Sequence, residues 1–126
     1  MRLATKVAAP LGAAALAVTG TVTLASPASA AETCPYPYVC FYDSSALESP
    51  GTHIIGKFQV VTSGWQWLSG AKGAAFVLNT RHDDVAYMHM TDGTVYCVLP
   101  GGSKNFDDDY PNRIVDAIRI SWSSTC

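Results

Sequence analysis

Four cysteines are the residues of this chain whose type and spacing most directly imply chemistry. Cys34 and Cys40 lie close together, whereas Cys97 and Cys126 stand alone later in the chain. An even number of cysteines in a short chain predicts either disulfide bonds or a structural zinc site. Zinc ligands come in closely spaced pairs, and these cysteines lack that spacing, so we expect disulfide bonds and no metal site.

The sequence alone does not choose among the three pairings that four cysteines allow. Local closure favours Cys34 with Cys40, because Pro35 and Pro37 stiffen the short segment between them. The remaining pair, Cys97 with Cys126, would then tie the last residue of the chain to a strand. A closed loop of about 30 residues stabilises a domain by roughly 3 to 4 kcal/mol.

Two further clusters contain residue types that perform catalysis or bind metals. His82-Asp83-Asp84 has the groups for acid-base work, but its place between the two halves of the chain predicts a solvated linker. On a strand, Met88 and Met90 share one face with His89 opposite, which suits core packing better than a soft-metal site. The sequence holds no nucleophile elbow, zinc-protease helix or phosphate-binding glycine loop, so we expect no enzymatic activity.

The first 30 residues have the organisation of an export signal. Arg2 and Lys6 form a basic start, an apolar run extends from Val7 to about Ala25, and Ala28-Ser29-Ala30 supplies the small residues of a cleavage site. A membrane anchor is the alternative, but the run is marginal in length and no charged stop-transfer segment follows it. We therefore expect a signal peptide at 1–30 and a secreted, extracellular protein.

The mature chain, residues 31–126, is long enough for one domain with one modest core. Of the 8 basic residues, Arg2 and Lys6 lie in the signal peptide, which leaves 6 against 10 acidic residues and a formal net charge of −4. Nucleic acids and anionic membrane surfaces both require a basic face on the protein. We therefore expect neither nucleic acid nor, after signal cleavage, membrane as a partner.

The mature chain contains short segments rich in β-branched and aromatic residues and little sign of long helices. Several of these segments alternate apolar with polar residues, which predicts strands. They are Thr52 to Val61, Val85 to Met90, Thr94 to Leu99 and Ile114 to Trp122. Turn signals rich in Gly and Pro separate them, so we expect an all-β sandwich or barrel. A helical turn is possible between Trp65 and Leu68, confined by Gly64 and Gly70.

The alternation in the last of these segments predicts which of its side chains face the core. Successive side chains on a strand point to opposite faces. The first parity is expected to be buried, with Asp116 as its polar exception: Ile114, Asp116, Ile118, Ile120 and Trp122. The other parity is expected to face away from the core: Val115, Ala117, Arg119 and Ser121.

The two halves of the mature chain have similar segments in the same order. Residues 39–42, 51–54 and 75–79 align with residues 85–88, 93–96 and 117–121. Two Greek-key units of about 40 residues, packed face to face, account for this order. Any all-β chain can produce such an alignment by chance, so the internal repeat is a hypothesis.

Three segments carry a resemblance to a known family. They are the cysteine clip and aromatic strand from Cys34 to Tyr42, then Phe76 to Thr80, and then Thr94 to Gly101. In this order and spacing, the chain resembles the secreted actinobacterial peptidase inhibitor family typified by the Streptomyces metalloproteinase inhibitor. The resemblance covers nearly the whole mature length. It implies a disulfide-stapled, βγ-crystallin-like sandwich of two Greek-key motifs that blocks an extracellular protease with a substrate-like loop.

The resemblance also implies which residues form the protease-binding loop. They are Cys97, Val98, Leu99 and Pro100. The family's reactive bond joins a cysteine to a valine, and the bond between Cys97 and Val98 is similar to it. The chain departs from the family after Pro100, where two glycines stand in place of the second cysteine that closes the family loop. A different interpretation makes Val98 and Leu99 core residues of a strand followed by a glycine-rich turn.

Crystallin-like proteins bind calcium through a short window of Asn, Asp, Ser and Thr ligands, and this chain has lost most of them. In the second half, Arg113 stands at an expected ligand position and Ala117 lacks a hydroxyl. The first-half window, Ala71 to Phe76, keeps none of the ligands. Because calcium needs several oxygens around one point, we expect degenerate calcium sites and no cofactor. The run Asp107 to Asp109 is more typical of a solvated turn than of a cation site.

These observations leave three functional hypotheses. The first is a monomeric inhibitor of an extracellular protease, such as a thermolysin-like metalloprotease. The alternative is a non-inhibitory crystallin-like binding or structural module, or a toxin-like protein, at the cell surface. This alternative is based on the aromatic side chains of Tyr36, Tyr38, Trp65 and Trp67. The third, a small hydrolase, depends only on the presence of His and Asp residues.

Overall fold

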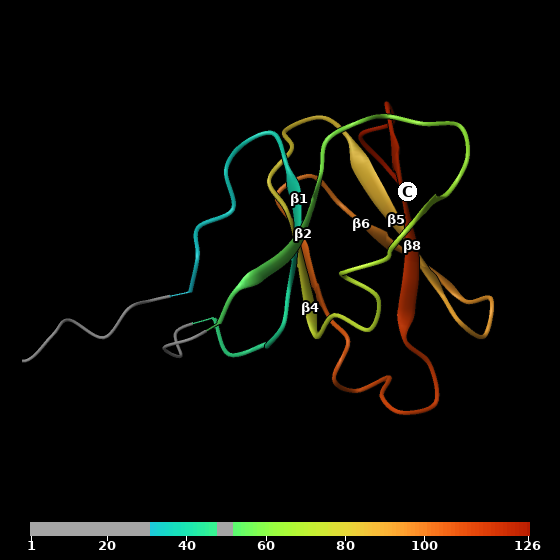
Figure 1. The fold of residues 1–126 in the computed structure, drawn as a ribbon. Helices are drawn as coiled ribbons and strands as arrows, with labels where there is room; N and C mark the ends of the chain where they lie inside the picture. Colours follow the sequence, from blue (N-terminus) through green and yellow to red (C-terminus); the bar gives the residue numbers. More distant parts are fainter. Residues whose placement is uncertain (1–30, 48–51) are drawn as a thin grey trace, which may run out of the picture.

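The computed structural model describes residues 31–47 and 52–126, so the expected signal peptide lies outside the described residues. Within these ranges the chain is all-β, with no helix, and its strands form two antiparallel four-stranded sheets (Figure 1). Consequently, no helix of the described part is long and apolar enough to cross a membrane. The expected all-β class is confirmed.

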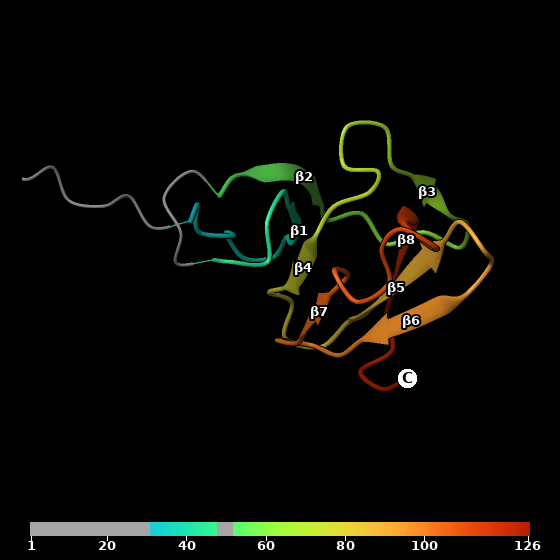
Figure 2. The same ribbon diagram turned by 90° about the horizontal axis from the view of Figure 1, so that it is seen from below.

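Each sheet combines strands from both halves of the chain. The first sheet has the order β2-β1-β4-β7 and the second has the order β3-β8-β5-β6. The strands are β1 (Val39–Tyr42), β2 (Ile54–Phe58), β3 (Gln66–Trp67), β4 (Phe76–Asn79), β5 (Val85–Met90), β6 (Val95–Val98), β7 (Ser103–Asn105) and β8 (Val115–Ser121). Seen from below in Figure 2, β3 lies beside β8 and β7 lies beside β4.

The two sheets are built in the same way from opposite halves. β1, β2 and β4 of the first half pair with one another and receive β7 from the second half. β5, β6 and β8 of the second half pair with one another and receive β3 from the first half. Each half therefore keeps its first, second and fourth strands in its own sheet and contributes its third strand to the other sheet.

The predicted strands are present, with shorter ends in most cases. β5 coincides with the predicted segment, whereas β2, β6 and β8 stop short of the predicted bounds. The possible helical turn near Trp65 is wrong, because Gln66 and Trp67 form β3 and pair with β8. The backbone amide of Leu68 continues this pairing by donating to the carbonyl of Asp116 at 2.9 Å. In this segment, hydrogen bonds to β8 thus replace the local hydrogen bonds that a helical turn would form.

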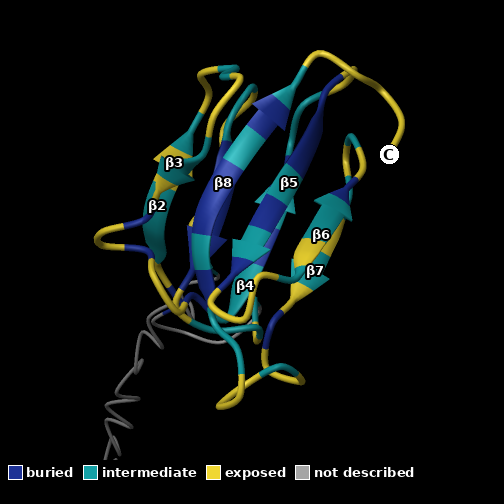
Figure 3. Cartoon of the chain, turned by 90° about the vertical axis from the view of Figure 1, so that its right-hand side faces the viewer, coloured by how far each residue is buried: buried dark blue, intermediate teal, exposed yellow. Residues whose placement is uncertain are grey.

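The main core lies between the two sheets, and both sheets supply fully buried side chains to it, while a smaller buried cluster surrounds the first disulfide. Val39, Phe41 and Val77 come from the first sheet, and Met88 and Ile118 are among those from the second. Burying a side chain of this size contributes roughly 1.5 to 3 kcal/mol. Figure 3 shows that the central strands β5 and β8 carry most of the buried positions of their sheet.

The prediction for the methionine pair is confirmed, because both thioethers lie in the core. Met88 and Met90 are fully buried, while His89 lies on the opposite face and is partly exposed. This is the alternation expected of a strand that covers a core with one face only.

The prediction for the last strand is wrong at both ends. Trp122 is 77% exposed, because β8 ends at Ser121 and the chain leaves the sheet there. Val115 is fully buried, because an irregularity in the pairing of β5 with β8 changes the parity near His89. Such a bulge inserts one extra residue, so side chains before and after it can face the same side. Ile118 and Ile120 are buried as expected, and Ala117, on the other parity, is fully buried as well.

The two disulfide bonds join the pair favoured by local closure and the pair that then remained. Cys34 bonds to Cys40 and Cys97 bonds to Cys126, with Cα–Cα distances of 5.9 and 6.0 Å. No free cysteine remains among the described residues. Disulfides form and persist in oxidising environments, which indicates such an environment for this protein.

Candidate functional site

The segment from Cys97 to Pro100 lies at the end of β6, which is an edge strand of its sheet. Cys97 and Val98 are still paired with β5, opposite Tyr87 and Ala86. Val98 is only 4% exposed and packs in the core, whereas Leu99 is 53% exposed. The structure therefore divides the predicted loop: Val98 belongs to the core and Leu99 faces solvent.

A tight turn follows Leu99 and reverses the chain into β7. The amide of Gly102 donates to the carbonyl of Leu99 at 2.9 Å, which closes a four-residue turn through Pro100 and Gly101. Gly101 has a φ of 71°. Proline at the second position and a positive φ at the third are the features of a type II turn, where glycine fits without strain. The turn thus fixes the backbone at Pro100 and Gly101, directly after Leu99.

Asn79, the last residue of β4, fastens this turn from inside the molecule. Its side chain is fully buried, and its amide nitrogen lies 3.2 Å from the carbonyl oxygens of both Val98 and Leu99. The same nitrogen donates to the carbonyl of Asp84 at 2.9 Å. The backbone amide of Asn79 also donates to the carbonyl of Gly102 at 2.9 Å. One buried side chain therefore links the turn after β6 to the junction between the two halves.

The junction between the halves forms one side of a pocket of about 360 Å³. Three separate segments line it: the disulfide loop before β1, the junction before β5 and the residue after β8. The lining residues are Tyr36, Arg81, His82, Asp83, Asp84 and Trp122. The rings of Tyr36 and His82 are stacked, with their centroids 4.4 Å apart and an angle of 24° between their planes.

The expectation that His82-Asp83-Asp84 is a solvated linker is wrong for Asp84. Asp84 is only 7% exposed and forms an ion pair with Arg81, whose side chain is also largely buried. A buried carboxylate requires such a partner, since an unpaired charge in the interior is strongly unfavourable. His82 and Asp83 are exposed as expected.

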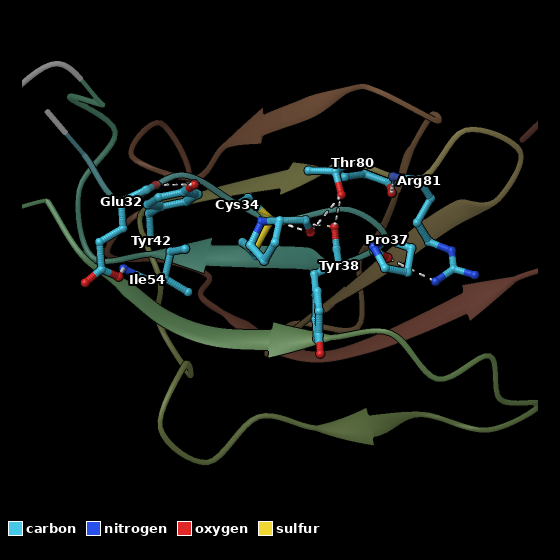
Figure 4. The surroundings of a disulfide bond; sticks show 11 residues. Glu32, Cys34, Pro37, Tyr38, Tyr42, Ile54, Thr80 and Arg81 are labelled. Carbon is cyan, nitrogen blue, oxygen red and sulfur yellow. Dashed lines mark hydrogen bonds between the residues drawn. A yellow bond between two sulfur atoms is a disulfide. The ribbon is translucent and has the colours of Figure 1, made fainter.

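Figure 4 shows how the first disulfide positions the loop that forms the pocket wall. The hydroxyl of Thr80 donates to the carbonyl of Tyr38 at 2.7 Å, and a guanidinium nitrogen of Arg81 donates to the carbonyl of Pro37 at 3.1 Å (Figure 4). On the other side of the disulfide, the hydroxyl of Tyr42 donates to the carbonyl of Glu32 at 2.8 Å. Burial raises the pKa of the Tyr42 phenol above its usual value.

A second group of aromatic side chains covers the outer face of the second sheet. Arg119 on β8 lies over the ring of Trp65 on one side and that of Tyr87 on the other, at 5.0 and 4.9 Å from their centroids. In the next row, His89 contacts the ring of Trp67 with a centroid distance of 5.6 Å. Trp67 is 65% exposed. Two tryptophans, a tyrosine and a histidine thus share one face with a cation between them.

The region that corresponds to the second calcium window is occupied by ion pairs. Arg113 binds Asp92 at 3.1 Å and donates to the hydroxyl of Tyr96, also at 3.1 Å. These interactions, the hydrogen bond with Tyr96 first, raise the pKa of the guanidinium. Arg113 and Lys104 both lie close to the carboxylate of Asp109. Within residues 31–47 and 52–126, no three His, Cys, Asp or Glu side chains are grouped as metal ligands would be.

Sequence reasoning missed Asn79 and the pocket. Asn79 ends an otherwise apolar strand, Phe76–Asn79, and an asparagine that closes an apolar run is a signal that was available in the sequence. The pocket had no such signal, because Tyr36 and Trp122 are separated by almost the entire mature chain. Comparisons with protein-family models, with curated proteins and with solved structures found no match for this chain.

Proposed function

We propose that this protein is a secreted inhibitor of an extracellular protease and that it presents the turn after β6 to the enzyme. The observation that carries the proposal is the exposure of Leu99 on a turn that is fastened on several sides. An inhibitor of this kind binds tightly because its loop is already ordered, so little conformational entropy is lost on binding. The resemblance to the peptidase inhibitor family gives the proposal its target class.

Three features support the rigidity that such a loop requires. The hydrogen bond between Gly102 and Leu99 closes the turn, and the side chain of Asn79 binds two carbonyls of the segment. The disulfide from Cys97 to Cys126 anchors the strand directly before the turn. In this proposal Leu99, rather than the buried Val98, enters the specificity pocket of the protease.

The proposal includes a βγ-crystallin-like arrangement of two Greek keys. It is supported by the equivalent construction of the two sheets, in which each half lends its third strand to the other. The segments aligned in the hypothetical repeat fall on β1 with β5 and on β4 with β8, at corresponding places in the two sheets. The two disulfides, which need an oxidising environment, support export.

Titration of the mature protein against a panel of secreted metallo- and serine proteases tests the proposal. Inhibition should reach completion near one equivalent for at least one enzyme, and Leu99→Asp should abolish it. Val95→Asp is the matched control, because Val95 is 45% exposed on the same strand, β6, but lies at its other end. The proposal fails if no protease is inhibited at stoichiometric protein, or if Leu99→Asp and Val95→Asp inhibit equally well.

The outer face of the second sheet supports a second candidate function, a non-inhibitory binding module acting at the cell surface. Exposed aromatic rings such as that of Trp67, with Trp65 and Tyr87 beside Arg119, are typical of binding surfaces. In this case Trp67→Ala would abolish association with intact cells or cell-wall material while Leu99→Asp would leave it unchanged. Equal association of both variants would remove this candidate.

A further inference from the structure

The pocket between the disulfide loop, the junction and the end of β8 is a site separate from the exposed turn at Leu99. Its aromatic walls face solvent: Tyr36 is 61% exposed and Trp122 is 77% exposed. Tyrosine and tryptophan are enriched at binding interfaces, where an apolar ring and a polar group are both in reach of a ligand. The volume of about 360 Å³ falls at the small end of the range for ligand pockets, which fits one short chain or side chain.

The wall formed by Tyr36 is held in place before any ligand arrives. The disulfide between Cys34 and Cys40 closes the loop that contains Tyr36, and the ring is stacked on His82. Arg81 ties the same loop to the junction through the carbonyl of Pro37. A ligand that enters the pocket would therefore meet an ordered aromatic surface.

The charges of the pocket favour a positively charged ligand. The guanidinium of Arg81 is largely engaged, because it pairs with Asp84 and donates to the carbonyls of Pro37 and Gln59. Its charge is neutralised by the carboxylate of Asp84, which disfavours an anionic ligand. Asp83 is exposed and forms no ion pair with any of the described residues. The free charge of the pocket is thus negative.

We propose that this pocket binds an organic cation, an alkylammonium or guanidinium group, between the rings of Tyr36 and Trp122 with Asp83 as its counter-charge. Aromatic faces attract cations through the negative potential of the ring, and a nearby carboxylate adds a charge-assisted hydrogen bond. The group can come from a lysine or arginine side chain of a partner protein or from a free amine. The site does not depend on protease inhibition.

Nuclear magnetic resonance of the ¹⁵N-labelled mature protein tests the site. The probes are N-acetyl-lysine amide, N-acetyl-arginine amide and butylammonium, with N-acetyl-norleucine amide as the uncharged analogue. Of the three tryptophan indole signals, we expect that of Trp122 to move on titration with the cations and those of Trp65 and Trp67 to stay. Stronger binding of the amino-acid amides would identify a protein side chain as the source, and equal binding of butylammonium would identify a free amine.

Three variants complete the test. Asp83→Asn and Trp122→Leu should each weaken binding of the cations about two- to fivefold, and the double variant should abolish it. Asp108→Asn, which removes the same charge from an exposed position outside the pocket, should leave binding unchanged. The proposal is overturned if the norleucine amide binds as well as the lysine amide, if Asp83→Asn binds like the unaltered protein, or if no cation shifts the Trp122 signal.

Discussion

Replacing Asn79 by aspartate is the most informative perturbation of this fold, because the two side chains have the same shape. Asn79 is fully buried, and its amide group donates to three carbonyls. Its carbonyl oxygen accepts from the amide of Arg81 at 3.1 Å. Aspartate keeps this acceptor but turns a second oxygen toward the carbonyls of Asp84, Val98 and Leu99. The substitution therefore exchanges attraction for repulsion without changing the packing.

The expected magnitude follows from the hydrogen bonds of that side chain. The amide group has two hydrogens for three carbonyls, so two full hydrogen bonds are lost. Each buried group left without a partner costs about 1 to 3 kcal/mol, and a buried carboxylate adds to this. We expect Asn79→Asp to lower the free energy of unfolding by about 3 to 5 kcal/mol and Asn79→Ala by about 2 to 4 kcal/mol. For a domain of this size, 4 kcal/mol lowers Tm by on the order of 20 °C.

Urea unfolding of the mature protein at pH 7, followed by tryptophan fluorescence and circular dichroism, measures the effect. Asn112→Asp is the control, because Asn112 is exposed and the same change there should alter stability by less than about 0.5 kcal/mol. The loss in Asn79→Asp should be smaller at pH 4, since burial raises the pKa of the new carboxyl and its protonated form can donate one hydrogen bond. If both Asn79 variants unfold within about 0.5 kcal/mol of the unaltered protein, the assigned role of Asn79 is wrong.

Three other predictions concern the stability of the same domain. The double variant Cys97→Ser/Cys126→Ser should unfold with a free energy about 3 to 4 kcal/mol lower, because a loop of this length loses its closure; an unchanged urea midpoint would contradict this. Gly56→Ala should destabilise by about 1 to 3 kcal/mol, since its new Cβ would lie 2.7 Å from that of Ala71, while Gly64→Ala, with no neighbour within 4 Å, should be near neutral in the same assay. Tyr42→Phe should cost about 1 kcal/mol at pH 7 through the lost hydrogen bond to Glu32. Because the folded-state pKa of Tyr42 is raised, the stability that its phenol contributes is complete below the unfolded pKa of 10.0 and falls as pH rises through the folded value. The difference in unfolding free energy between Tyr42→Phe and the unaltered protein should therefore narrow above pH 10. A difference that widens there would refute the assignment.

Much of the fold was predictable because its central strands follow simple alternation. Met88 and Met90 face the core from a strand whose bounds the pattern gave correctly, and proximity favoured the observed cysteine pairs. β7 was not predictable, since Ser103–Asn105 is polar and largely exposed and is a strand only through its pairing with β4. β3 is likewise defined by its partner, β8.

The candidate sites were less predictable than the core for a different physical reason. Whether Val98 or Leu99 is exposed depends on where β6 ends, and the ends of strands are set by tertiary pairing rather than by local pattern. The pocket depends on Tyr36, His82 and Trp122 lining one space, and no periodicity in the sequence connects these residues. Asp84 shows the same limitation, because its burial is possible only with Arg81 beside it.

The exchange of third strands has a consequence for how the chain can be divided. A fragment ending at Thr80 would leave β3 without β8 and expose the edge of β4 that β7 normally covers. The complementary fragment would have the opposite defect at the outer edge of β8. Neither half is therefore a self-sufficient folding unit, and unfolding should be a single cooperative event. Mixed together, the two fragments should complement one another, each supplying the strand that the other lacks.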